Sequence, residues 1–241
     1  AGEPDVIHGA LDETAADLVE VIDVSVAQLW ETIESLERLQ PRNLKRFRVS
    51  IFGSARIEAT HPLFGEAQNL AQRLAEAGCD IVTGGGGGLM QAVDLGASRG
   101  AVQQPADGDL PVRLVVDDET APFVERVYRH RTFFSRLHHF VRLSSAFVVL
   151  PGGIGSTLEA MMVWQLLQAR HLPPTPFILY GSHWRGLLRW IEEDALGQGY
   201  VAEEDTRLPI QVDTVDQAVE IILRTLREFQ ARHTDPQEGK P

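Results

Sequence analysis

The stretch AFVVLPGGIGSTLE, residues 146–159, decides how the rest of this chain is interpreted. An apolar run at residues 147–150 is interrupted by Pro151-Gly152-Gly153, and a helical pattern begins near Ser156. A short apolar run that ends at turn residues and leads into a helix is typical of a buried strand feeding a helix N-terminus. The stretch therefore predicts one strand–turn–helix unit of an α/β sheet.

The same junction has the chemistry of an anion site. The first N–H groups of a helix lack intrahelical partners and lie at the positive end of the helix dipole, so they favour a phosphate. Gly152 and Gly153 have no Cβ atoms to keep an anion from the backbone, and Ser156 and Thr157 add hydroxyl donors. The sequence predicts a phosphate cradle at this junction.

A structural alternative competes for the same residues. The pattern Ser156-x-x-Glu159 fits a capping box, in which Glu159 turns back to cap its own helix. Spacing alone favours the capping box, but the two glycines before it favour the cradle, because a plain helix start needs no such clearance. Beside a bound phosphate, the Glu159 carboxylate suits acid–base chemistry at a sugar.

The strand–glycine–helix pattern also occurs twice earlier in the chain. The first unit has a strand at 49–52, the turn Gly53-Ser54-Ala55-Arg56 and a helix at 64–77; the second has a strand at 80–83, glycines at 84–88 and a helix at 89–98. Successive units of this kind imply a parallel sheet with right-handed crossovers.

The remaining elements complete one domain. We expect strands at 112–116, 176–180 and 208–212, helices at 131–143, 183–195 and 215–229, and a loop at 197–207. The predicted fold class is α/β, with a doubly wound parallel sheet in residues 46–232. A helical N-terminal extension is expected in residues 1–45 and a disordered tail in residues 233–241.

Composition excludes several classes of function. The net charge of -12 argues against a duplex nucleic-acid binder, which needs a basic face. Lysine occurs only at Lys45 and Lys240, so a pyridoxal-phosphate decarboxylase has no good candidate for the lysine of its Schiff base.

The single cysteine, Cys79, excludes an internal disulfide and is expected in the core at the entry to a strand. No apolar run reaches the roughly 20 residues of a membrane span, and the acidic N-terminus lacks a signal-peptide pattern. We therefore expect no membrane partner and a cytoplasmic protein.

The glycine run TGGGGGLM, residues 83–90, does not match known nucleotide motifs. It lacks the G-x-G-x-x-G spacing of dinucleotide-binding turns and the Gly-Lys-Ser/Thr of Walker A. It nevertheless lies between a strand and a helix, at the edge where open α/β sheets bind ligands, so a ligand-binding role is favoured over a plain turn.

Arg136 lies between apolar positions in the segment FFSRLHHF. Such an arginine is most often a surface residue whose charged end reaches solvent. The neighbouring His138 and His139 have no convincing metal-ligand spacing, so no metal site is expected.

Four segments together resemble the LOG (Lonely Guy) family of cytokinin-activating nucleoside 5′-monophosphate phosphoribohydrolases, which are often mislabelled lysine decarboxylases. They are FGSAR at 52–56, TGGGGGLM at 83–90, FFSR at 133–136 and PGGIGSTLE at 151–159. The resemblance implies a Rossmann-like homodimer or higher homo-oligomer that cleaves the N-glycosidic bond of an AMP-like nucleotide to free base and ribose 5-phosphate, without a cofactor.

The resemblance also implies roles for individual residues. Arg136 and Glu159 match the family's catalytic arginine and glutamate. The phosphate-binding turn corresponds to Gly152, Gly153, Gly155, Ser156 and Thr157, and the ribose and base would be bordered by Ser54, Gly84, Gly85, Gly86 and Met90.

Three positions depart from the family pattern. Ser156 replaces the usual threonine, Leu137 replaces a common lysine and Gln91 replaces an acidic residue. These changes concern the choice of base more than the reaction class. A rival of a different class is a non-catalytic nucleotide or molybdenum-cofactor carrier of similar fold, which would need the cradle but not the Glu159 carboxylate.

Overall fold

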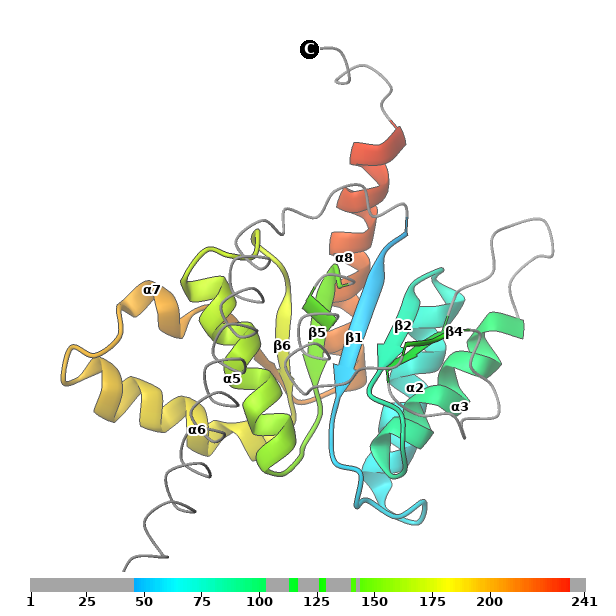
Figure 1. Ribbon diagram of the computed structural model, residues 1–241, viewed down its shortest axis with the longest axis horizontal. Helices are drawn as coiled ribbons and strands as arrows, with labels where there is room; N and C mark the ends of the chain where they lie inside the picture. The colour runs from blue at the N-terminus through cyan, green and yellow to red at the C-terminus, as the bar shows by residue number, and fades with distance from the viewer. Residues whose placement is uncertain (1–45, 103–112, 117–125, 129–139, 142–143, 235–241) are drawn as a thin grey trace, which may run out of the picture. The chain divides into compact units, whose positions relative to one another are not determined.

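The computed structural model describes residues 46–102, 113–116, 126–128, 140–141 and 144–234. Its centre is a seven-stranded sheet in which every described pair of neighbouring strands is parallel (Figure 1). The strands are β1 (Arg48–Phe52), β2 (Asp80–Thr83), β3 (Arg113–Val116), β4 (Arg126–Tyr128), β5 (Ala146–Val149), β6 (Phe177–Tyr180) and β7 (Pro209–Val212).

The order of the strands in space confirms the doubly wound fold. It runs β4-β3-β2-β1-β5-β6-β7, so the chain builds outward from β1 in one direction and then returns to add β5 on its other side. Ile51 is in register with Thr83 of β2 on one side and with Val148 of β5 on the other. The sheet therefore has a topological switch point between β1 and β5, where such folds bind ligands.

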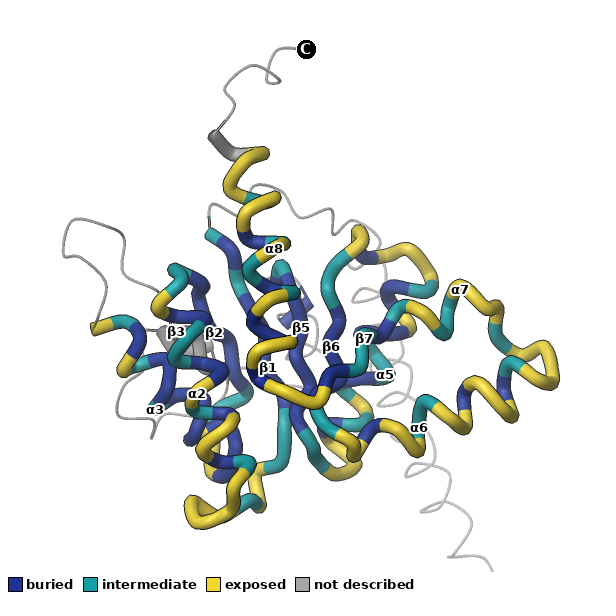
Figure 2. Tube along the Cα trace, turned by 180° about the vertical axis from the view of Figure 1, so that it is seen from behind, coloured by how far each residue is buried: buried dark blue, intermediate teal, exposed yellow. Residues whose placement is uncertain are grey.

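Helices connect the strands and cover the sheet (Figures 1 and 2). They are α2 (Pro62–Glu76), α3 (Leu89–Val102), α5 (Ile154–Gln168), α6 (Arg185–Trp190), α7 (Glu203–Thr206) and α8 (Val215–Thr234). A 3₁₀ turn, Ser182–Trp184, precedes α6, and a π-helical turn, Ile191–Leu196, follows it.

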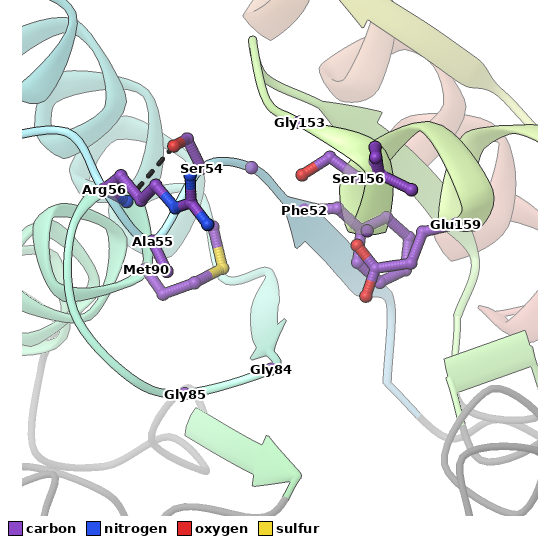
Figure 3. A pocket seen from close by; sticks show the side chains of 13 residues that line it. Phe52, Ser54, Ala55, Arg56, Gly84, Gly85, Met90, Gly153, Ser156 and Glu159 are labelled. Carbon is purple, nitrogen blue, oxygen red and sulfur yellow. Dashed lines mark hydrogen bonds between the residues drawn. The ribbon is translucent and has the colours of Figure 1, made fainter.

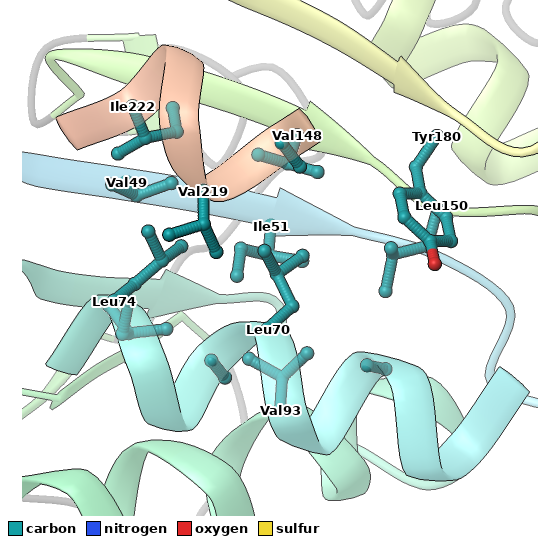
Figure 4. Close-up of a cluster of buried hydrophobic side chains, with 14 of the residues drawn as sticks. Val49, Ile51, Leu70, Leu74, Val93, Val148, Leu150, Tyr180, Val219 and Ile222 are labelled. Carbon is teal, nitrogen blue, oxygen red and sulfur yellow. The ribbon is translucent and has the colours of Figure 1, made fainter. Parts of the chain in front are cut away.

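One face of the sheet is covered by α2, α3 and α8. Alternate residues of β1, Val49 and Ile51, point into this layer together with Val148 of β5 and are fully buried (Figure 4). The helices contribute side chains at helical spacing, among them Leu70 and Leu74 of α2 and Val219 and Ile222 of α8. Side chains on the same face recur every second residue along the strands and about every 3.6 residues along the helices. The apolar faces formed in this way pack against one another.

The opposite face has an aromatic core. Phe52 at the end of β1 contacts Phe140 edge-on, with ring centroids 4.9 Å apart, and lies near Phe147 of β5. Trp184 is buried there and donates its indole N–H to the carbonyl of Val149 at 3.0 Å. Because both faces are covered, the central strands are apolar almost throughout, as buried parallel strands require.

The structure corrects several expectations about secondary structure. The segment 197–207, expected to be a loop, contains α7, and Asp205 holds its start by accepting from the Ala202 N–H at 3.0 Å. The expected helix at 183–195 is divided among 3₁₀, α and π turns, and α8 continues to Thr234. Strand β4 was not anticipated, because three residues are too few to show a strand period.

Three expectations lie outside the described residues: the helical extension at 1–45, all but two residues of the helix at 131–143, and residues 235–241 of the tail. Within the described part of the chain, no helix combines the length and the apolar character needed to cross a bilayer.

Candidate functional site

A pocket of about 520 Å³ opens beyond the carboxyl ends of β1, β2 and β5, at the switch point of the sheet (Figure 3). This volume falls in the usual range for small-molecule sites. Its lining comes from the end of β1, from the turns after the three strands and from the N-terminal parts of α3 and α5: Phe52, Gly53, Ser54, Ala55, Arg56, Gly84, Gly85, Met90, Gly153, Ile154, Gly155, Ser156 and Glu159.

One wall of the pocket, here called the α5 wall, is the N-terminal part of α5, residues 153–159. Gly153 is the N-cap residue, with an extended backbone and no side-chain cap. The first intrahelical bond runs from the Thr157 N–H to the Gly153 carbonyl at 2.9 Å, so the amides of the preceding helical residues lack such partners. Cβ atoms added at Gly153 or Gly155 would meet no atom of the described chain within 4 Å, so the backbone there is open to an approaching anion.

The helix start corrects the capping-box interpretation. Helix α5 begins at Ile154, not near Ser156, so Ser156 lies inside the first turn and cannot be the N-cap of a box closed by Glu159. The hydroxyl that bonds to the N-cap residue belongs to Thr157, which donates to the Gly153 carbonyl at 3.0 Å. Glu159 instead lines the pocket.

Gly152 and Ser156 form one packed unit. A Cβ atom at Gly152 would lie 2.2 Å from the Ser156 Oγ and 2.5 Å from its Cβ. Gly152 therefore makes room for Ser156 rather than for a ligand. Ser156 is only 6% exposed and lines the pocket, and no residue of the described chain forms a hydrogen bond with its hydroxyl.

The opposite wall, here called the β1 wall, consists of Ser54, Ala55 and Arg56 after β1. The Ser54 N–H donates to the Pro151 carbonyl at 3.2 Å, and its own carbonyl accepts from the Leu89 N–H at 2.9 Å. Gly88 has φ +64°, and a Cβ there would lie 2.5 Å from both the Ala55 carbonyl carbon and the Ser54 oxygen. The β1 wall is therefore held tightly by its neighbours.

The glycine loop forms the third side. The Thr83 hydroxyl accepts from the Gly85 N–H at 3.2 Å and donates to the buried Asp94 carboxylate of α3, also at 3.2 Å. Gly85 and Gly86 have φ values of +71° and +90°, a region that other residues rarely adopt. The loop thus turns sharply around a fixed hydroxyl and brings Gly84 and Gly85 to the pocket.

The structure brings most of the residues expected from the sequence to one pocket. Its lining includes Glu159, Gly153, Gly155, Ser156, Ser54, Gly84, Gly85 and Met90. Three others, Gly152, Gly86 and Thr157, are not in the lining, and Arg136 lies outside the described residues.

Sequence reasoning overlooked Arg56. It ends the FGSAR segment that carried part of the resemblance, so the signal was present, but no role was assigned to it. Of the lining residues that the structure describes, Arg56 is the only cation and Glu159 the only carboxylate.

Cys79 is in the core, as expected. It is fully buried, and burial raises the pKa of its thiol from 9.0 to about 12. The thiol therefore stays protonated at neutral pH and is not a nucleophile. Among the described residues, no group of three or more His, Cys, Asp or Glu side chains is arranged to hold a metal ion.

Comparison with protein families identifies the group to which the chain belongs. The model of a family described as possible lysine decarboxylase matches residues 90–222, more than half of the chain. The chain belongs to this family. Several similar curated proteins are named as LOG enzymes, which agrees with the resemblance drawn from the motifs.

Three of these relatives are named cytokinin riboside 5′-monophosphate phosphoribohydrolases. LOG2 of Arabidopsis thaliana is 28% identical over 172 residues, which cover 70% of this chain and 77% of LOG2. LOG of Oryza sativa subsp. japonica is 30% identical, with 68% and 65% covered, and the Mycobacterium marinum protein is 27% identical, with 73% and 92% covered.

Solved structures share the fold of this family member. The molybdenum cofactor carrier protein of Chlamydomonas reinhardtii superposes with a TM-score of 0.57 at 16% identity, covering 76% of this chain and 99% of its own. The molybdenum cofactor binding protein of Rippkaea orientalis gives a TM-score of 0.55 at 17% identity, with 76% and 98% covered. At these identities the likeness concerns the fold alone.

The description of the family as possible lysine decarboxylases does not fit the residues that line the pocket of this member. A pyridoxal-phosphate decarboxylase holds its cofactor on a lysine. None of the described lining residues is a lysine, and both lysines of the chain, Lys45 and Lys240, lie outside the described residues.

Proposed function

We propose that this protein hydrolyses the N-glycosidic bond of purine nucleoside 5′-monophosphates, giving the free base and ribose 5-phosphate. The observation that carries the proposal is the position of Glu159. It lines the same pocket as the open N-terminal turn of α5, one and a half turns farther along that helix. A phosphate at the helix N-terminus would therefore bring the attached ribose near a carboxylate.

Each part of the pocket has a role in this proposal. The first amides of α5 and the Ser156 hydroxyl bind the 5′-phosphate. The ribose and base lie along Gly84, Gly85 and Met90. The Glu159 carboxylate stabilises the oxocarbenium-like transition state and orients the attacking water, as carboxylates do in glycoside hydrolysis. Arg136 is assigned to catalysis from the sequence motif.

The proposed reaction uses water as its only co-substrate. Water supplies a hydroxyl group to C1′ of the ribose while the bond from C1′ to the base nitrogen breaks, and the base leaves with a proton. No electrons are exchanged with a redox partner, and the proposed chemistry uses neither a metal nor pyridoxal phosphate. The names of the relatives support this reaction class.

We also propose that the catalytic domain, residues 46–232, forms a homodimer. Ile154, which also lines the pocket, and Leu158 lie one turn apart on α5 and are 90% and 46% exposed, and a second copy of the chain would cover this apolar pair. Sedimentation at micromolar concentration is expected to give a dimer, and a monomer would contradict this part of the proposal.

Incubation with nucleotides tests the reaction. The protein is mixed with AMP and, separately, with isopentenyladenosine monophosphate, and free base and ribose 5-phosphate are measured by chromatography. Wild type is expected to release both products in equal amounts. The Glu159→Gln variant is expected to lose at least about 100-fold in rate, because the neutral amide neither stabilises the cationic transition state nor orients water as a base.

Glu220→Gln is the matched control, since Glu220 is an exposed residue of α8. It is expected to retain full activity. A carrier protein would bind AMP and release no base from a broad nucleotide panel, and that result would overturn the proposed function. Equal turnover by the Glu159→Gln variant and wild type would remove Glu159 from the mechanism.

A further inference from the structure

Arg56 is a cation in the pocket that the catalytic assignment does not use. Arg56 is exposed and lines the pocket. No carboxylate in the described part of the chain lies within ion-pair distance of its guanidinium. Figure 3 shows Arg56 and Met90 on one side of the pocket and Ser156 and Glu159 on the other. The cation therefore stands opposite the N-terminus of α5.

The backbone that carries Arg56 is fixed by its surroundings. The Arg56 N–H donates to the Ser54 hydroxyl at 3.1 Å, which closes a tight turn after β1. Leu89 and Pro151 hold Ser54 by the two backbone hydrogen bonds of the β1 wall, and Gly88 packs directly on Ala55. The side chain of Arg56 thus extends from a rigid base, which lowers the entropic cost of holding it against a ligand.

The α5 wall alone leaves part of a phosphate without partners. A 5′-monophosphate carries about two negative charges at neutral pH and three strong acceptor oxygens. The helix amides and the Ser156 hydroxyl, which is buried and has no hydrogen-bond partner in the described part of the chain, would contact it from one side only. A guanidinium offers five N–H donors in a plane and pairs with phosphate in two-pronged fashion, so Arg56 suits the oxygens that face away from α5.

We propose that Arg56 binds the 5′-phosphate from the wall opposite α5 and thereby makes the pocket selective for nucleoside monophosphates over nucleosides. The identity of the ligand as a nucleotide rests on the proposed function. The effect of Arg56 is local, because the chain as a whole has a net charge of -12.

Equilibrium binding tests this role separately from catalysis. Binding of AMP and of adenosine is measured by calorimetry and ligand-observed NMR in a Glu159→Gln background, in which turnover is expected to be at least about 100-fold slower. Adding Arg56→Ala is expected to weaken AMP binding by about 10- to 100-fold, the usual loss for a charge-assisted hydrogen bond, while adenosine binding changes less than twofold. Arg56→Lys is expected to keep part of the AMP affinity, because it retains the charge but not the planar donors.

The matched control is Arg227→Ala, which removes an exposed arginine from α8 and is expected to leave both affinities unchanged. Thermal melting checks that each variant is folded. The inference is overturned if Arg56→Ala leaves AMP affinity within twofold, which would make Arg56 a solvated surface residue. It is also overturned if AMP and adenosine lose affinity equally, which would place Arg56 against the base. Because these measurements report affinity and not product formation, either result is distinct from a failure to cleave AMP.

Discussion

The two walls of the pocket are built differently. Both follow a buried strand and carry a serine and one charged side chain, but only the α5 wall contains glycines. The β1 wall is packed from behind by Gly88 and tied to Leu89 and Pro151 by backbone hydrogen bonds. The α5 wall has an open backbone at Gly153 and Gly155.

The difference shows that glycines in a ligand-binding turn have two separate functions. Gly88 and Gly152 are required because another part of the protein occupies the space of a side chain. Gly153 and Gly155 leave space that no atom of the described residues fills within 4 Å. Replacing Gly88 or Gly152 should therefore lower stability, whereas replacing Gly153 or Gly155 should lower ligand affinity. Three glycine substitutions and one pair of hydroxyl substitutions test this comparison.

The largest effect on stability is expected for Gly88→Ala. The new methyl group would collide with the Ala55 and Ser54 backbone, and the residue would be held at φ +64°, where alanine is strained. The free energy of unfolding should fall by roughly 2–4 kcal/mol, measured by urea denaturation. A loss below about 0.5 kcal/mol would show that the β1 wall is not rigid.

Gly152→Ala should lower the free energy of unfolding by about 1–3 kcal/mol, the usual cost of overpacking. The collision is with the Ser156 side chain, so adding Ser156→Gly should recover part of the loss. A double-mutant cycle of the four proteins measures this coupling. Strict additivity of the two changes would mean that Gly152 is needed for some reason other than room for Ser156.

Gly155→Ala is expected to have effects of opposite sign on stability and binding. Alanine is favoured over glycine in a helix, and its methyl group would meet no atom of the described residues within 4 Å, so the free energy of unfolding should rise by about 0.5–1 kcal/mol. The same methyl group would stand where the phosphate approaches, so AMP affinity should fall by about tenfold or more. Unchanged AMP affinity in a folded variant would place the phosphate elsewhere.

The smallest effects compare two neighbouring hydroxyls of α5. Ser156→Ala should weaken AMP binding by about 2- to 10-fold with little change in stability, since this hydroxyl lines the pocket. Thr157→Ala should instead lower the free energy of unfolding by about 0.5–1 kcal/mol and leave AMP affinity unchanged, since the Thr157 hydroxyl bonds to Gly153. Reversed behaviour of the two variants would mean that Thr157 turns toward the ligand when it binds.

Much of the site was predictable because its residues are close in sequence. The apolar runs ending at glycines identified β1, β2 and β5, and the carboxyl ends of parallel strands meet at one edge. The distinction between a capping box and an open cradle was not predictable, since it depends on whether α5 begins at Ile154 or two residues later. A shift of that size lies within the uncertainty of any helix boundary.

The role proposed for Arg56 likewise could not be predicted from the sequence. In the sequence Arg56 is an arginine in a turn, and most such residues are solvated. Its significance comes from facing α5, which begins about a hundred residues later and is brought close by the pairing of β1 with β5.

The sequence by itself determined the α/β class, the order of most strands and helices, the membership of the family and the chemistry available at the α5 turn. Those features depend on local periodicity and on turn residues, which act over a few positions of the chain. Only the tertiary structure decided which glycines are packed and which are open, where α5 starts, and that Arg56 shares a pocket with Glu159. These features depend on distances between segments far apart in the chain, which are set by the packing of the whole sheet and its helices.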